Sequence, residues 1–213
     1  MYPVSYQADY PGGGRNRLTT FFRYIVSIPW LIVATLYGLV AGIVVVIAWF
    51  ALVFSARYPE GLYNFVGGYL RMISRVNAFM YLATDEWPPF NGEDNPSYPV
   101  RIGVPAPKAE YSRMKVLFRL IVGIPVLLLA YVQSLIAAVI ALIGWFAILF
   151  TGRLSEGLFD PLRSALAYTT RANAYFMLLT EDYPPFSLEE QAGPGAAAAP
   201  PAPPPDPGTT PQP

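Results

Sequence analysis

Residues 24–56 read YIVSIPWLIVATLYGLVAGIVVVIAWFALVFSA, a run without a single charged side chain. A second uncharged run of the same length, LIVGIPVLLLAYVQSLIAAVIALIGWFAILFTG, occupies positions 120–152. One membrane crossing requires about 20 apolar residues, and two crossings require about 40 and a turn. Each run is therefore too long for one upright helix and too short for two, and its conformation decides the fold.

Two conformations are compatible with these runs. In the first, each run forms one long helix that bends at Pro29 or Pro125, spans the bilayer and protrudes from it. Trp30 and Trp49 are 19 residues apart, about 28 Å along a helix, which matches the separation of two aromatic belts. In the second, each run is a re-entrant hairpin that returns both arginine-bearing ends to one side. We favour the long helix, because no strong turn signal marks a hairpin tip and unbroken helix satisfies the backbone in lipid.

The composition of the whole chain indicates a membrane protein without an enzymatic site. Of its 213 residues, 54% are hydrophobic and 13% are charged, whereas a typical soluble domain carries about 25% charged residues. The formal net charge is zero, so no overall field attracts nucleic acid. Cysteine and histidine are absent, which excludes disulfides, Cys/His zinc sites and Ser-His-Asp triads. We therefore expect no catalytic, cofactor or metal site.

The chain is a tandem duplication. Residues 15–90 align without a gap on residues 111–186 at a constant offset of 96, so that Arg75-x-Asn77-Ala78 falls on Arg171-x-Asn173-Ala174. Matches at polar positions cannot come from shared hydrophobicity, and they indicate two copies of one fold. We divide the chain into a polar segment 1–14, repeat one at 15–90, a Pro-rich linker 91–110 that is extended and exposed, repeat two at 111–186, and an Ala/Pro-rich tail 187–213 that is disordered.

A tight turn and a second helix follow the long run in each repeat. The second helices cover roughly residues 61–84 and 157–180, and both carry arginine. Arginine facing lipid at mid-bilayer is costly, so these helices either lie along the interface or turn their arginine face into a bundle. The sequence thus predicts an all-α membrane protein in which two tandem helical-hairpin repeats form a small bundle. We expect a multi-pass protein of the cell membrane, with the lipid bilayer as its main partner.

Three sets of residues are candidates for specific roles. The arginines that open each repeat either contact anionic lipid head groups or anchor the repeat at the interface. The Arg/Asn pairs of the second helices either line a polar seam or form structural pairs. Small residues four apart on the long runs favour close helix packing. The three sets are Arg17, Arg23, Arg113 and Arg119; Arg75, Asn77, Arg171 and Asn173; and Gly38, Gly42, Ser134 and Ala138.

The adjacent carboxylates Asp85-Glu86 and Glu181-Asp182 are interpreted as solvated helix ends rather than cation ligands, because adjacent side chains rarely aim at one point. They precede Pro-Pro-Phe in both repeats, which we expect to stop the second helix.

The combined motifs resemble those of a known family. Both repeats carry Arg-x5-Arg-x4-Ile-Pro, Trp-Phe-Ala, Glu-Gly-Leu, Arg-x-Asn-Ala and Pro-Pro-Phe. This pattern is similar to an uncharacterised family of bacterial membrane proteins, common in actinobacteria and classed as a domain of unknown function. The resemblance implies a membrane location and supplies no substrate, cofactor or catalytic residue. Repeat two departs from the turn motif, with Ser155 where repeat one has Pro59.

Three functional hypotheses follow. The first is a non-enzymatic accessory or scaffold protein that associates with other membrane proteins or with a second copy. The second is a membrane-shaping protein with reticulon-like hairpins, whose shallow wedges widen one leaflet. The third is a small transporter or channel subunit, which requires the Arg/Asn pairs of both repeats to face a shared interior.

Overall fold

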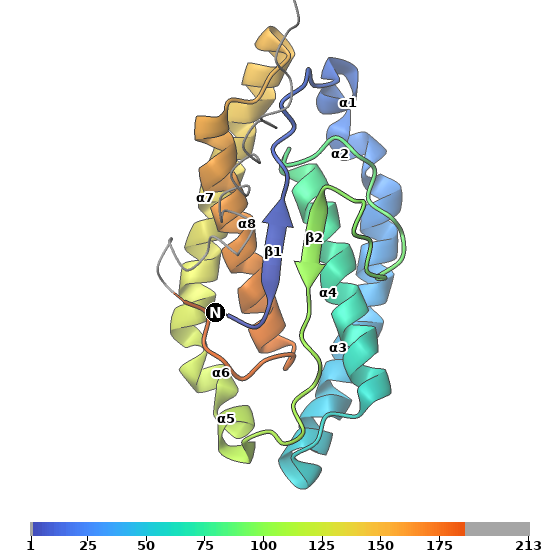
Figure 1. Cartoon of the computed structure of the whole chain (residues 1–213), viewed down its shortest axis with the longest axis vertical. Coiled ribbons are helices and arrows are strands. Elements are labelled where there is room, and N and C mark those ends of the chain that lie inside the picture. Colours follow the sequence, from blue (N-terminus) through green and yellow to red (C-terminus); the bar gives the residue numbers. More distant parts are fainter. Residues whose placement is uncertain (1, 186–213) are drawn as a thin grey trace, which may run out of the picture.

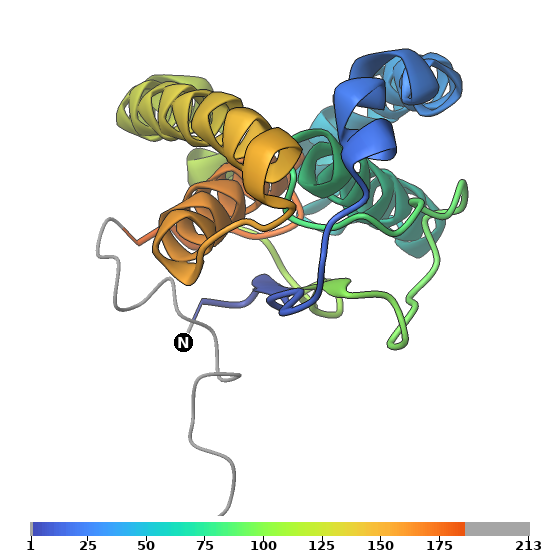
Figure 2. The ribbon, with the colours of Figure 1, turned by 90° about the horizontal axis from the view of Figure 1, so that it is seen from above.

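The computed structural model describes residues 2–185 and arranges them in three layers (Figures 1 and 2). Two long apolar helices, α3 (Ile28–Ser55) and α7 (Ile124–Thr151), form the first layer. The second helices, α4 (Glu60–Met80) and α8 (Glu156–Phe176), form the middle layer. Strands β1 (Ser5–Ala8) and β2 (Val100–Gly103) pair as an antiparallel ribbon in the third layer. The prediction for the tail 187–213 concerns residues outside the described range.

Most of each uncharged run forms one unbroken helix of 28 residues, which confirms the long helix over the hairpin; the first three residues of each run belong to a preceding short helix. The prolines do not bend this helix, because Pro29 and Pro125 lie in its first turn, where a missing N–H leaves no helical bond unmade. The breaks lie earlier in the chain. The basic stretch before each long helix forms two short helices, α1 (Arg17–Phe21) and α2 (Arg23–Val26) in repeat one, and α5 (Arg113–Leu117) and α6 (Arg119–Val122) in repeat two.

Small residues allow the long helices to approach the middle layer closely. On α3 the buried positions Ala34, Ala41 and Ala48 recur at a heptad spacing and face α4. Gly38 also lies at this contact, since a Cβ there would stand 2.6 Å from the Tyr69 hydroxyl.

Two of the other residues expected to pack, Gly42 and Ala138, lie away from this contact. Gly42 faces open space, Ala138 is exposed, and the Ser134 hydroxyl donates to the Ala130 carbonyl of its own helix at 2.8 Å. The seam therefore follows the alanine stripe rather than the small-x-x-x-small pairs.

The two repeats run in opposite directions and close on each other. The Tyr111 N–H donates to the Ala56 carbonyl at the end of α3, and the Arg15 N–H donates to the Gly152 carbonyl at the end of α7, both at 2.8 Å. These two bonds join equivalent positions, exchanged between the repeats. Each long helix therefore ends where the other repeat begins, and α3 and α7 are antiparallel.

An approximate two-fold axis relates the repeats and runs normal to the layers. Equivalent residues meet at two places on it. Between α4 and α8, the Thr170 hydroxyl donates to the Ser74 hydroxyl at 3.2 Å. In the ribbon, Tyr6 pairs directly with Ile102. Because the first place lies in the middle layer and the second in the ribbon, the line through both crosses the layers.

The ribbon belongs to the duplication, although the sequence did not lead us to expect strands. Tyr2-Pro3-Val4 recurs as Tyr98-Pro99-Val100 at the same offset of 96. Val4, Val100 and Ile102 are buried against the middle layer in the main hydrophobic core. The expectation that the whole linker 91–110 is exposed was therefore wrong for β2, which is held by pairing with a distant segment.

The ends of the long helices generate a stability prediction. Ala56 and Gly152 follow α3 and α7 in the left-handed conformation, with φ of 56° and 74°. A residue with a Cβ pays roughly 1–2 kcal/mol for this conformation, partly offset by its stiffer unfolded chain. Ala56→Gly should raise the free energy of unfolding by roughly 1 kcal/mol, measured by denaturant titration in detergent. Gly152→Ala is the matched control and should lower the free energy of unfolding by a similar amount. If both variants changed the free energy of unfolding in the same direction, the left-handed conformation would not explain the effect.

Candidate membrane-binding face

The exposed large hydrophobic side chains gather on one face of the molecule, formed by α3, α7 and the short helices. Leu39 on α3 is 67% exposed and Leu128 on α7 is 66% exposed. Only 17% of the most apolar stretch of either helix is buried inside the protein, whereas the core helix of a soluble protein is mostly buried. By length and composition, both helices qualify to cross a membrane.

Several polar groups on this apolar face are satisfied within the protein. The hydroxyls of Thr35, Ser55 and Thr151 each donate to the carbonyl of the preceding helical turn at 2.7 Å. The indole N–H of Trp49 donates to the Val116 carbonyl at 3.3 Å, and that of Trp145 donates to Thr20 at 3.0 Å. The face therefore requires no water to satisfy these groups, which suits a hydrocarbon environment.

Four exposed arginines mark the two ends of this apolar face. A guanidinium N–H of Arg17 donates to the Phe150 carbonyl at 3.3 Å, which places Arg17 at the end of α7, beside the turn that carries Arg153. The equivalent residues Arg113 and Arg57 occupy the other end, where repeat two begins beside the end of α3. Within residues 2–185 none of the four takes part in an ion pair.

The ribbon side is polar. Alternation along β1 buries Tyr6 and turns Ser5 and Gln7 outward. Arg101 on β2 donates two hydrogen bonds to the Asp9 carboxylate at 2.8 and 2.6 Å. This bidentate bond raises the pKa of Arg101, so the pair stays charged and hydrated. The molecule thus has an apolar face and, across its thickness, a polar one.

Two buried arginines hold the apolar layer on the middle layer. Arg23 is 1% exposed and donates to the carbonyls of Phe79 and Thr84, with its guanidinium 4.5 Å from the Phe79 ring centre. Burial lowers the pKa of Arg23, and the neighbouring Asp85 opposes that shift. We call Arg23, or Arg119 in repeat two, together with the carbonyls that it binds, the arginine clamp of its repeat. Since an arginine does not deprotonate in proteins, the clamp carries a permanent buried charge.

Arg119 occupies the equivalent place in repeat two. It is 3% exposed and donates to the carbonyls of Tyr175 and Thr180. Burial lowers its pKa as well. Both arginines are enclosed by protein, so neither is placed for the head-group contact considered from the sequence. That role remains for Arg17 and Arg113, which are exposed.

Asp85 is a structural residue that the sequence analysis missed. Its carboxylate accepts hydrogen bonds from Arg15 at 2.9 Å, from Arg23, and from the Asn16 N–H at 3.3 Å. The side chain is 25% exposed, so the interpretation of a solvated helix end does not describe it. Its position shortly after the end of α4 indicated that its carboxylate could bind nearby backbone groups. Its actual partners, Arg15, Asn16 and Arg23, lie in the segment that opens the repeat and could not be identified from that position.

The equivalent carboxylate in repeat two has different partners. Glu181 accepts from the Ser112 N–H at 2.5 Å and pairs with Lys108 at 3.4 Å. The Nη2 atom of Arg119 finds no hydrogen-bond partner among the described residues. The buried arginine therefore forms an ion pair with the equivalent carboxylate in repeat one only.

The Arg/Asn pairs of the second helices do not come together in one seam. Arg75 donates to the Glu93 carbonyl at 2.8 Å and to Val100 at 3.5 Å, beneath the linker. Arg171 lies 5.8 Å from the ring centre of Tyr2, beneath the N-terminal segment. Asn77 and Asn173 lie half-buried near the ends of α4 and α8. The residues that meet between the repeats are Ser74 and Thr170 instead.

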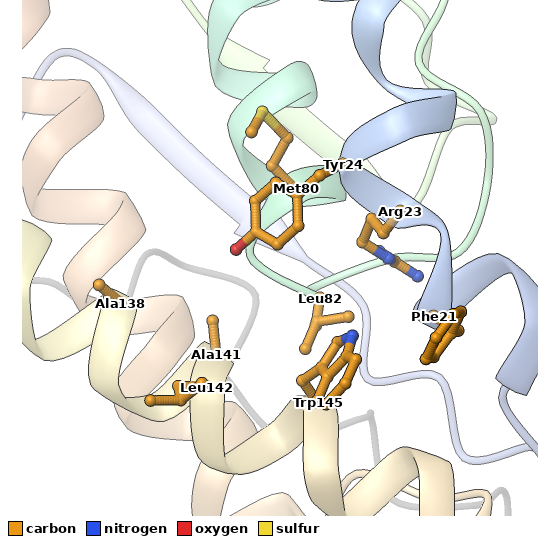
Figure 3. Close-up of a pocket in the computed structure, with 9 residues that line it drawn as sticks. All are labelled: Phe21, Arg23, Tyr24, Met80, Leu82, Ala138, Ala141, Leu142 and Trp145. Atoms are coloured by element: carbon orange, nitrogen blue, oxygen red, sulfur yellow. The ribbon is translucent and has the colours of Figure 1, made fainter.

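A cavity of about 270 Å³ opens on the apolar side between α2, α7 and the end of α4 (Figure 3). Its walls include Tyr24, Met80, Leu82 and Trp145, and they are mainly apolar. Within residues 2–185 no group of three acidic side chains is placed to hold a metal ion.

These features define a duplicated helical protein whose apolar face is compatible with membrane association. Residues 17–91 and 113–187 each match the family described as Domain of unknown function (DUF4389). The two matches cover most of the chain, which therefore belongs to this family and carries its domain in two tandem copies. No curated protein and no solved structure matches the chain. The bacterial origin suggested by the motifs stays a prediction.

The unequal clamps predict unequal mutational effects. Asp85→Asn leaves two buried arginines without their carboxylate and should lower the free energy of unfolding by about 3 kcal/mol. Glu181→Gln is the matched control at the equivalent position. It removes a pair with a half-exposed lysine and should cost less than about 1 kcal/mol. Denaturant titration in detergent measures both, and equal losses would show that the carboxylate of repeat one has no special role.

Proposed function

We propose that this protein is a non-enzymatic accessory or scaffold protein of the cell membrane. One observation carries the proposal: the apolar side chains gather on the layer of α3 and α7, and the polar ribbon lies on the opposite side of the molecule. Such a molecule is held by lipid through one face and presents the other to aqueous partners. A multi-pass arrangement stays a prediction, because α3 and α7 qualify as spans by length and composition alone.

The ribbon supplies a contact surface for a partner. It consists of only two strands, so each strand has an outer edge, and exposed strand edges commonly pair with other chains. Ser5 and Gln7 point outward on β1, and the charged pair Asp9–Arg101 lies at the Gln7 end of the ribbon, since Gln7 pairs with Arg101. The proposed partner is another membrane protein or a second copy of this chain.

Site-directed photo-cross-linking tests the scaffold proposal. A photoreactive residue at Gln7, on the ribbon, should give protein adducts in intact cells, which mass spectrometry identifies. The same residue at Val46, which is 56% exposed on α3, is the matched control and should give lipid adducts. A ribbon that yields no protein adduct, in a chain that still folds and sediments as a monomer, would count decisively against a scaffold.

Lipid contact by the exposed arginines has its own test. Each arginine near an anionic surface contributes about 1 kcal/mol of attraction. The double variant Arg17→Gln, Arg113→Gln should therefore retain several-fold less anionic lipid after purification in mild detergent, measured by lipid mass spectrometry. Arg101→Gln on the ribbon removes one cation from the polar face and should leave lipid retention unchanged.

Membrane shaping is the second candidate, and one observation favours it: the apolar face is broad and confined to one side. A wedge in one leaflet widens that leaflet and bends the bilayer. Unchanged curvature of large liposomes at high protein density would exclude it. The transporter hypothesis has lost its main support, because Arg75 and Arg171 lie beneath different segments rather than facing a shared interior.

A further inference from the structure

The two-fold axis constrains how the protein sits in a bilayer. Because α3 and α7 are antiparallel, upright helices would place equivalent ends of the repeats on opposite sides of the membrane. Those ends carry the same residues, since Arg17 corresponds to Arg113 and Arg57 to Arg153. Arginine-bearing ends are strongly biased towards the cytoplasmic side, so identical ends belong on the same side. An axis parallel to the membrane normal satisfies this requirement, and the helices then lie in the membrane plane.

The position of the ribbon leads to the same orientation. Strands β1 and β2 lie alongside the middle helices, not beyond their ends (Figure 1). With upright helices, the strand edges and the charged pair Asp9–Arg101 would stand at the depth of the hydrocarbon. Open sheet edges exposed to lipid do not occur there, because their backbone groups find no partner. With helices in the plane, the ribbon faces water.

The dimensions and charges fit one leaflet. A helix with its side chains is about 10–12 Å across, and one leaflet offers about 15 Å of hydrocarbon. The exposed Arg17, Arg57, Arg113 and Arg153 then lie at the ends of the embedded layer, from which their long side chains extend to the head groups. The ribbon, with Asp9 and Arg101, is the layer farthest from lipid.

We propose that the protein is monotopic rather than multi-pass as expected from the sequence: α3 and α7 lie parallel to the membrane plane within one leaflet, α4 and α8 lie at the interface above them, and the ribbon stands in water. The partner of the apolar face is the hydrocarbon of a single leaflet with anionic head groups at its rim. This inference rests on the membrane residence in the proposed function and specifies its geometry.

The absence of cysteine in the 213-residue chain allows a direct depth measurement. Ile32, Ile43 and Phe54 recur at intervals close to three whole turns, so they lie on nearly the same side of α3, and each is more than half exposed. Leu128, Val139 and Phe150 are the equivalent positions on α7 and are also more than half exposed. Each position is changed singly to cysteine, as in Ile43→Cys, and labelled with a fluorophore. Gln7→Cys on the ribbon is the aqueous control.

The labelled full chain is reconstituted in phosphatidylcholine and phosphatidylglycerol vesicles that contain lipid-borne quenchers at a shallow or a deep acyl position. We expect one depth at the three positions of α3, the same depth at the three positions of α7, and no lipid quenching at Gln7. Upright helices would place the label at Ile43 about 16 Å deeper than those at Ile32 and Phe54.

Every other outcome overturns the inference in a recognisable way. A maximum of depth at Ile43 and Val139 shows crossing helices and leaves the scaffold proposal standing. Labels that are shielded from both water and lipid quenchers, in a protein that sediments as a dimer, show that a second copy covers the face. Labels that are all accessible to water show no membrane residence, which overturns the scaffold proposal as well. Six equivalent positions guard against a single variant that fails to fold.

Discussion

The crossed hydrogen bonds of two tryptophans show the constraint on which the fold depends. The Trp145 indole on α7 donates to Thr20 in repeat one, and the Trp49 indole on α3 donates to Val116 in repeat two. The short helices of each repeat thus pack on the long helix of the other, so neither repeat is complete alone. This exchange makes α3 and α7 antiparallel, and it places both on the same side of the molecule. The single apolar face is a consequence of how the duplication closes.

The features that the sequence predicted are those that local physics determines. A long uncharged run whose proline lies in the first helical turn, and which has no strong turn dipeptide, gives a continuous helix in an apolar environment. The turn with Glu60 or Glu156 begins the next helix. The ribbon could not be found this way, because a segment as short as Ser5–Ala8 becomes a strand only by pairing with a distant part of the chain. The recurrence of Tyr-Pro-Val at positions 2 and 98 was the available signal, and it indicated duplication rather than strands.

The arginines show where spacing carries too little information. Arg17 and Arg23 open the same basic stretch and look alike in sequence, yet one is exposed and the other is enclosed. The difference comes from the end of α4, where the carbonyls of Phe79 and Thr84 and the Asp85 carboxylate converge on Arg23. A buried guanidinium is stable only where several acceptors replace its water. No pattern within residues 15–23 indicates that Arg23, and not Arg17, lies close to such acceptors in the folded protein.

The geometry of those acceptors has its origin in an unusual turn. Leu82 and its equivalent Leu178 adopt φ of 67° and 65°, which costs roughly 1–2 kcal/mol for a residue with a Cβ. Glycine would avoid that cost but would forfeit the burial of a leucine side chain, worth about 1.5–3 kcal/mol. The Leu82 side chain packs against α7 at Gly144, where an added Cβ would stand 3.6 Å from Leu82 Cδ1. The turn lets the Ala83 N–H bond to the Ala78 carbonyl at 2.8 Å and leaves the Thr84 carbonyl free for Arg23. A packing contact between repeats thus sets the turn, the turn presents the acceptor, and the arginine bound there fixes the helices that carry the apolar face.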